Sequence, residues 1–270
     1  MRRKSFGVGL KALVVGVLLT GLPIWSEENA AEILQRFVSS GGSKGAAADQ
    51  YTYVEQADYI DFDKNGHAHK NRSETHDIIF VEGLVYKKLV ARNGQPLEAK
   101  EQAKEEKRLR KTAEERRQER RSGLLHKQVS LGSDQELLTL FDPQLAGEEE
   151  IRGHQAWVVE CTPKAGHVPA GAHEKEVLSF RRRLWIDKQE SALVRSVSTV
   201  VGEHIFLMPG STITWEFEKV NGEAWLPVSG LIEGQLQFAK FIKPRVRTEY
   251  TNSQFQKFNV ESTITVEAVK

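Results

Sequence analysis

The sequence predicts a mainly β protein built on one curved antiparallel sheet, and two observations lead to that class. Roughly ten to twelve segments have the length and the alternation of apolar and polar residues that strands show. Several are joined by sequences typical of hairpin turns, such as Asn65-Gly66 and Asn221-Gly222. Strands at this spacing are expected to form an antiparallel sheet that curls into a barrel or a sandwich.

The hairpin over 176–201 is the clearest of these segments. Because side chains alternate along a strand, its first strand has Leu178, Phe180, Leu184 and Ile186 on one face and Val177, Ser179, Arg181, Arg183 and Trp185 on the other. Residues 187–190 form the turn, and the second strand, 192–201, is rich in β-branched residues. Whether the three consecutive arginines face solvent or a ligand stays open at this point.

The other elements are expected on both sides of this hairpin. A helix is expected over 28–40, where Ile33, Leu34, Phe37 and Val38 share one face, and a short apolar helix or turn over 134–141. Further strands are expected over 51–62, 67–82, 84–91, 150–154, 156–162, 211–220, 224–233, 235–243, 245–253 and 258–269.

The segment 96–122 differs from the rest in composition. In 98–121, 17 of 24 residues are charged, ten basic and seven acidic. Pro96 suits a helix start and Gly123 a helix end, so the segment is predicted to be a long charged helical insertion. One interpretation is a solvated helix between strands. The other is a docking arm for an acidic partner or anionic lipid, with Arg116, Arg117, Arg120 and Arg121 as candidate docking residues.

The N-terminus predicts export. Three basic residues, 2–4, precede an apolar run over 6–22, which is the pattern of a secretory signal peptide. We therefore expect a signal peptide over 1–26 and one domain over 27–270, with an uncleaved N-terminal anchor as the alternative. Cys161 is the only cysteine and cannot form an intrachain disulfide. It is expected to be buried in a strand.

Charge and motifs exclude several classes of protein. The formal net charge of +1 argues against a nucleic-acid binder. Asp61, Asp63, Asn65 and Gly66 match the first half of a calcium loop, but the twelfth position is Arg72, so a hairpin turn is expected instead. His67 and His69 are expected to be solvated rather than metal-bound. No catalytic or nucleotide-binding motif is present, so no enzyme, metal or cofactor is expected, although a catalytic triad is defined by geometry rather than by order.

A series of short motifs carries a family resemblance. They are YTYVE (51–55), RNGQPL (92–97), GEEEIRGH (147–154), AWVV (156–159), LWID (184–187), LVR (193–195), GS (210–211) and AWLP (224–227), with Trp215 between the last two. In this order they resemble the periplasmic outer-membrane lipoprotein-sorting and lipoprotein-carrier (LolA-like) superfamily. The resemblance implies an antiparallel half-open barrel with an apolar inner face, and helices lying across its mouth.

The resemblance also implies a function. It suggests a periplasmic, monomeric carrier or binding module whose partners are lipoprotein acyl chains or lipid, and an inner- or outer-membrane envelope protein. Each buried methylene contributes about 0.8 kcal/mol, so acyl chains need a large apolar groove. Candidate groove residues are Trp157, Phe180, Trp185, Trp215, Phe217 and Trp225, for which ordinary core packing is the alternative. Two other functions are open: an envelope sensor of the same fold that binds a regulatory protein, and an enzyme on a β scaffold.

Overall fold

The computed structural model describes residues 29–42, 48–63, 65–122, 133–237 and 244–258. The expected signal peptide over 1–26, and all but the first residue of the strand expected over 258–269, lie outside this part of the chain. Within it, no helix is both long and apolar enough to cross a membrane.

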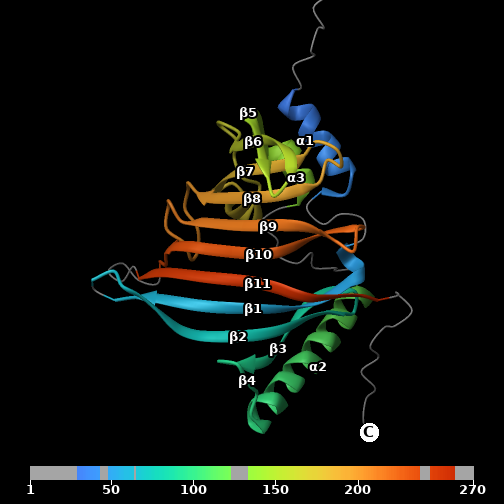
Figure 1. Ribbon diagram of the computed structural model, residues 1–270, viewed down its shortest axis with the longest axis vertical. Helices are drawn as coiled ribbons and strands as arrows, with labels where there is room; N and C mark the ends of the chain where they lie inside the picture. Colours follow the sequence, from blue (N-terminus) through green and yellow to red (C-terminus); the bar gives the residue numbers. More distant parts are fainter. Residues whose placement is uncertain (1–28, 43–47, 64, 123–132, 238–243, 259–270) are drawn as a thin grey trace, which may run out of the picture.

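One antiparallel sheet dominates the described part of the chain (Figure 1). Its strand order is β4-β3-β2-β1-β11-β10-β9-β8-β7-β6-β5. The strands are β1 (Tyr51–Phe62), β2 (Ala68–Val81), β3 (Leu84–Arg92), β4 (Gln95–Pro96), β5 (Phe141–Ile151), β6 (His154–Pro163), β7 (Phe180–Asp187), β8 (Leu193–Val200), β9 (Thr212–Val220), β10 (Ala224–Gln235) and β11 (Arg245–Lys257). The predicted class, a mainly β protein with a single curled sheet, is confirmed.

The strand order explains why the sheet is a half-open barrel. Strands adjacent in sequence pair with each other, except β4 and β5, and the first and last strands, β1 and β11, also pair along most of their length. Pairing of β4 with β5 would close the ring. The chain instead leaves the sheet between these two strands and forms α2 (Ala99–Arg121) and α3 (Asp134–Leu140). The barrel is therefore open at the place where the chain is helical.

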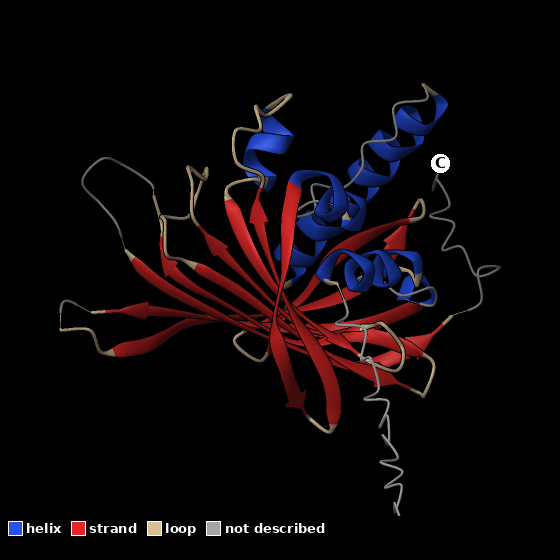
Figure 2. Ribbon diagram, turned by 90° about the horizontal axis from the view of Figure 1, so that it is seen from above, coloured by secondary structure: helices blue, strands red, loops and turns tan. Residues whose placement is uncertain are grey.

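Two helices cover one end of the sheet. α1 (Ala30–Ser39) begins at Asn29, whose side chain accepts the N–H of Ala31, and α3 begins with a capping box formed by Ser133 and Glu136. Both helices contribute apolar side chains to a core that also contains residues of β6, β7 and β9, and Phe37 of α1 is fully buried. We call the face of the sheet on which α1 packs the inner face. Figure 2 shows the helices on one side of the curved sheet.

The charged helix α2 covers the edge of the sheet at the other end. Glu105 accepts the N–H of Leu89 at 3.3 Å, Arg108 donates to the carbonyl of Lys87 at 2.8 Å, and Arg116 donates to the carbonyl of Leu84 at 2.9 Å. These backbone groups belong to β3, whose free edge is paired only with the two residues of β4. Unpaired strand edges invite association with other chains, so α2 protects this edge.

Several expected boundaries shift. The first strand of the 176–201 hairpin begins at Phe180, because residues 172–177 form the short helix α4 (Ala172–Val177). β5 is longer than expected, since it continues directly from α3 at Phe141. The strand expected over 235–243 is not a separate element in its described part, because β10 continues to Gln235 and residues 238–243 lie outside the described residues. β4 and the one-turn helix η2 (Ala48–Gln50) were not expected.

Candidate functional site on the inner face

The centre of the inner face carries aromatic side chains. Trp215 of β9 lies opposite Gly230 of β10, Gly230 lies opposite Tyr250 of β11, and Tyr250 lies opposite Ala57 of β1. Side chains in register on antiparallel strands point to the same face. These residues therefore form one row across four strands, which we call the aromatic row.

A glycine allows the two large rings of this row to meet. The ring centroids of Trp215 and Tyr250 lie 5.4 Å apart, although β10 runs between their strands. A Cβ atom on Gly230 would come within 2.5 Å of the Trp215 ring. The indole thus lies flat over the β10 backbone, where only glycine leaves it room.

A second, more aliphatic row runs beside the first. Ile213 of β9, Ile232 of β10, Thr248 of β11 and Tyr59 of β1 follow one another in register. At its β7 end this row begins with Arg182, which lies opposite Ser198 of β8, and Ser198 lies opposite Ile213. We call this the Arg182 row. The two rows together form a mostly apolar strip with a buried cation at one end.

A group of charged side chains lies on β1, β2 and β3 beside this strip. The carboxylate of Glu55 is 3% exposed and accepts two hydrogen bonds from Lys87 Nζ, at 2.8 and 2.9 Å. The same ammonium group lies 5.4 Å from the centre of the Tyr250 ring. Burial raises the pKa of the Tyr250 hydroxyl, with smaller contributions from Tyr59, Glu55 and Glu74, so this phenol stays neutral.

His76 lies between two carboxylates of this charged group. Its Nδ1 is 3.9 Å from Glu55 and its Nε2 is 3.8 Å from Glu74, and Nδ1 has no hydrogen-bond partner. Burial lowers the pKa of the imidazole and outweighs the opposite effect of Glu55 and Glu74. The imidazole is therefore neutral at pH 7 and has an unused polar atom on the inner face.

The six predicted groove residues occupy three environments. Trp157, Phe217 and Trp225 belong to the core beneath α1. Phe180 packs with Val200, Leu207 and Ile213 in a neighbouring cluster, whereas Trp215 lies between the two clusters and reaches the centre of the inner face. Trp185 packs with Ala156 and Val158 on the outer face, and its indole N–H donates to Glu149. Trp215 alone of the six belongs to the rows defined above.

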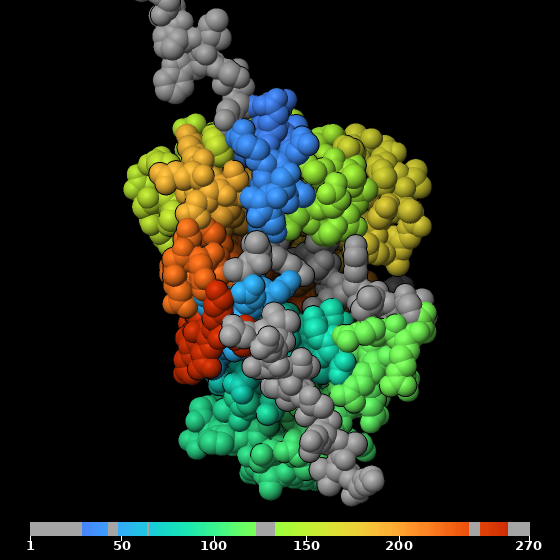
Figure 3. Space-filling model, turned by 90° about the vertical axis from the view of Figure 1, so that its right-hand side faces the viewer, coloured from blue at the N-terminus to red at the C-terminus, as the bar shows by residue number. Residues whose placement is uncertain are grey.

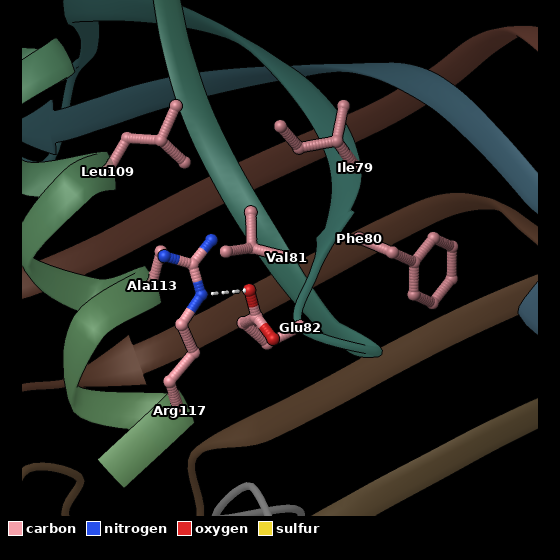
Figure 4. A pocket seen from close by; sticks show the side chains of 7 residues that line it. All are labelled: Ile79, Phe80, Val81, Glu82, Leu109, Ala113 and Arg117. Carbon is pink, nitrogen blue, oxygen red and sulfur yellow. Dashed lines mark hydrogen bonds and ion pairs between the residues drawn. The ribbon is translucent and has the colours of Figure 1, made fainter. Parts of the chain in front are cut away.

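Three of the four predicted docking arginines contact the β2–β3 hairpin. Arg116 donates to the carbonyls of Val81, Leu84 and Val85, and Arg117 pairs with Glu82 at 2.6 Å. Arg120 donates to the carbonyl of Glu82, and Arg121 is exposed. Figure 4 shows Arg117 and Glu82 beside a pocket of about 20 Å³, close to the volume of a single water. Figure 3 shows α1 and α3 side by side at one end of the molecule and α2 at the other.

A larger pocket lies between α2 and the β3–β4 edge. It has a volume of about 200 Å³ and is lined by Lys88, Leu89, Val90, Pro96, Leu97, Gln102, Glu105 and Glu106. Glu105 is already bound there by Tyr86 and Arg108, at 2.9 and 2.7 Å. The contacts of this pocket therefore hold α2 against the sheet.

The calcium-loop match beginning at Asp61 and the single cysteine, Cys161, both have structural roles. The Asp63 carboxylate accepts the N–H groups of Asn65 and His67, both at 2.8 Å, as in a hairpin turn. Across the described residues, no three metal-binding side chains lie close enough together to hold an ion. Cys161 is fully buried on β6, as predicted, and burial raises the pKa of its thiol to about 12, which makes it unreactive.

Sequence reasoning missed Arg182, Tyr250 and the charged group around Glu55. Alternation along 245–253 places Thr248 and Tyr250 on one face, so part of the signal was present. The pairing of β1 with β11 brings these residues beside Ala57 and Tyr59. Since these strands are separated by most of the chain, no local pattern predicts that pairing.

Comparisons with known proteins find only remote structural similarity. No protein-family model matches the chain, and no curated protein matches its sequence. Among solved structures, the chain is similar to an outer-membrane lipoprotein-sorting protein domain from Vibrio parahaemolyticus, with 10% identity, a TM-score of 0.42, and coverage of 87% of this chain and 96% of that one.

Two further solved structures extend this comparison. The LolA superfamily protein NE2245 from Nitrosomonas europaea has 12% identity, a TM-score of 0.33, and coverage of 86% of this chain and 95% of that one. The Pseudomonas aeruginosa MucA/MucB complex gives 11% identity, a TM-score of 0.26, and coverage of 84% and 98%. One of these solved structures is thus described as a member of the superfamily that the motifs of this chain resemble. At these TM-scores no function follows from the likeness.

Proposed function

We propose that this protein is a periplasmic binding module for an acylated ligand, a lipoprotein or a lipid, whose apolar chain lies along the two rows of the inner face. The observation that carries the proposal is the apolar strip itself. In the described part of the chain, α1 and α3 pack mainly against β5 and β6, and α2 against β3. The aromatic row and the Arg182 row lie between these helix-covered ends.

The chemistry of the strip suits an amphiphile. Trp215, Tyr250 and Ile232 are only partly buried and offer apolar surface, and each methylene transferred from water to such a surface contributes about 0.8 kcal/mol. Charged groups lie near both ends, Arg182 at β7 and Lys87 with Glu55 at β1 and β3. Ligand sites in proteins combine a mostly apolar lining with a few polar groups in this way.

The same proposal covers export, domain extent and oligomeric state. The segment 1–26 acts as an export signal, residues 27–270 form one domain, and the protein acts as a monomeric carrier rather than an enzyme. The LolA-like motifs support this view as a resemblance.

A pair of neighbouring residues tests the proposal. Ile232 points to the inner face and Leu231 to the outer face of the same strand. Ile232→Asp should weaken binding of a fluorescent fatty acid at least about tenfold, because a carboxylate would then be buried in the strip. Leu231→Asp should leave binding unchanged. If Ile232→Asp does not fold, Ile232→Phe replaces it as the test variant, because it adds bulk to the strip without adding a charge. Wild-type protein that binds no fatty-acid probe, or equal binding by all variants, would contradict the proposal.

A second function is favoured by one specific observation. In the connection between β8 and β9, the side chains of Val201, Ile205 and Phe206 are 50%, 66% and 57% exposed. Exposed apolar groups of this kind often mark protein-binding surfaces. Under this alternative the protein senses the envelope and binds a regulatory protein. Native mass spectrometry of protein purified from its own envelope separates the two functions, since it would find either an acyl ligand or a protein partner.

A further inference from the structure

Arg182 is a buried arginine at the β7 end of the Arg182 row. Its side chain points to the inner face, and the residue is 8% exposed. Its Nε and Nη2 atoms make no hydrogen bond, and none of the carboxylates in the described residues forms an ion pair with it. An uncompensated buried charge is strongly unfavourable, so such a group calls for an explanation.

The surroundings of Arg182 do not neutralise its charge. Its guanidinium carbon lies 5.3 Å from the centre of the Phe141 ring, and its strand neighbours on the same face are Cys161 and Ser198. The carboxylates that favour the charged form of the guanidinium are Asp134 and Glu136 of α3. Glu136 is already engaged, since it accepts hydrogen bonds from Ser133 and lies 2.8 Å from His173 Nε2. Burial lowers the pKa of Arg182 to about 10, so the guanidinium remains charged at pH 7.

The two unpartnered nitrogens define what could bind. Nε and Nη2 lie on the same edge of the planar guanidinium group, where their N–H bonds form a fork. Such a fork matches the two oxygens of a carboxylate or phosphate. The Phe141 ring packs near the guanidinium without using these donors, because it offers a π face rather than an acceptor oxygen.

The position of Arg182 in the sheet relates this fork to the apolar strip. In the direction of β9, the Arg182 row continues with Ser198 and then with Ile213 and Ile232. Neighbouring strands lie about 4.8 Å apart, so Ile213 is only about 10 Å from Arg182 across the sheet. The order of these side chains, which are buried or half-buried in this structure, matches a ligand with an anionic group at one end and an apolar chain at the other.

We propose that Arg182 binds the anionic group, a carboxylate or a phosphate, of the amphiphile held on the inner face. The inference rests on the proposed function and adds the charge of the ligand's head group to it. Arg181 and Arg183 have no part in this site, because they point to the outer face, where Arg183 pairs with Glu149 and Glu160.

The experiment compares ligands that share one chain and differ in the head group. Palmitate, hexadecyl phosphate and hexadecanol each compete with a fluorescent probe for wild-type protein, Arg182→Met, Arg182→Lys and the control Arg181→Met. Wild-type and Arg181→Met should bind the two anions about 10- to 100-fold more tightly than the alcohol, the range expected for charge-assisted hydrogen bonds. Arg182→Met should lose this preference and keep its affinity for hexadecanol, and Arg182→Lys should keep part of the preference.

The variants are expected to fold. Replacing a buried, unpaired charge with an apolar side chain of similar length is often neutral or stabilising, so Arg182→Met should melt at or above the wild-type temperature. If Arg182→Met does not fold, Arg182→Lys provides the test, because lysine keeps the charge but lacks the paired N–H donors of the guanidinium group. An undiminished preference for the anions in these variants, or equal wild-type binding of all three ligands, would overturn the role of Arg182 while leaving the proposed function intact.

Inorganic phosphate tests the anion site of Arg182 independently of amphiphile binding. If phosphate alone raised the melting temperature in an Arg182-dependent manner while no amphiphile bound, the proposed function would fail and Arg182 would stand as an anion site. If neither phosphate nor any amphiphile had an effect on wild-type protein, both proposals would be wrong.

Discussion

At the scale of single residues, Gly230 is the position where the smallest change should have the clearest effect. A Cβ there would meet ring atoms of Trp215 at 2.5 to 2.9 Å, and an indole cannot move aside as a flexible chain end can. Gly230→Ala should therefore destabilise the protein by about 1–3 kcal/mol, the range for overpacking. It should also displace Trp215 from Tyr250. Urea unfolding and tryptophan fluorescence measure the two effects.

The matched control for Gly230→Ala is the same change in a Trp215→Leu background. The smaller side chain leaves room for the new methyl group, so the extra destabilisation should largely disappear in the double mutant. Equal destabilisation by Gly230→Ala with and without Trp215 would mean that the indole does not lie on the glycine.

The three consecutive arginines show what the sequence could and could not predict about single residues. Alternation correctly places Arg181, Arg183 and Trp185 on one face and Phe180 and Leu184 on the other. It does not say which face α1 covers, and a run of three charges suggests solvent. The burial of Arg182 depends on Phe141, which lies about forty residues earlier and reaches β7 only through the pairing of β5, β6 and β7.

At the scale of elements, α2 is explained better by its contacts with the sheet than by its composition. Its buried positions are Glu105 and Ala113, with Leu109 packed beside them. Leu109 and Ala113, two of the few apolar residues of α2, face the sheet. The sequence alone could not place Glu105 beside them, because a buried carboxylate is recognisable only from its partners, Tyr86, Arg108 and the N–H of Leu89.

Arg116 tests the role of α2 as a cover for the sheet edge. Its guanidinium donates to three carbonyls, those of Val81, Leu84 and Val85, at 2.9 to 3.0 Å. Arg116→Ala should cost about 1–3 kcal/mol, because it leaves part-buried acceptors without a donor. Hydrogen exchange should quicken in the β2–β3 hairpin and stay unchanged in β6–β8. Arg110→Ala, an exposed position on the same helix, is the control. Faster exchange throughout the sheet, or no change in the hairpin, would contradict a local capping role.

At the scale of the whole molecule, the open ring follows from a single departure of the chain from the sheet. The hairpins were predictable from turn sequences such as Asn221-Gly222, where Asn221 and Gly222 both take positive φ. The sheet becomes one body because β1 and β11 pair, and it stays open where the chain leaves it between β4 and β5, with α2 and α3 following β4 in sequence. The pairing of β1 with β11 has no local sequence signal, whereas the helical insertion over 96–122 was predicted from composition and its flanking residues. The resemblance to LolA-like proteins, rather than the strand pattern, indicated a half-open barrel.

The pH dependence of stability should also be a property of the whole molecule. Three of the carboxyl groups with lowered pKa values lie in α2, in α3 and in the β7–β8 turn. Burial raises the pKa values of Glu105 and Glu136, but hydrogen bonds outweigh it, and hydrogen bonds from Lys219 and Trp225 lower that of Glu190. The unfolded chain then binds more protons than the folded one, so stability is full above the ordinary glutamate pKa of about 4.3 and is lost as the pH falls through the lower folded values.

We therefore expect the urea midpoint to be level from about pH 7 to 5.5, apart from a small decline due to His76, and to fall steeply between about pH 5 and 3. His76 contributes in the same direction, because its pKa is lowered in the folded state and its unfolded form protonates first, near pH 6.5. Glu105→Gln should lower the midpoint at pH 7 and flatten the acid decline, because it removes one of the titrating groups, whereas the exposed Glu114→Gln should follow the wild-type curve. A urea midpoint that rises on acidification, or a Glu105→Gln curve parallel to that of the wild type, would show that the ionised forms of these carboxylates do not stabilise the folded protein.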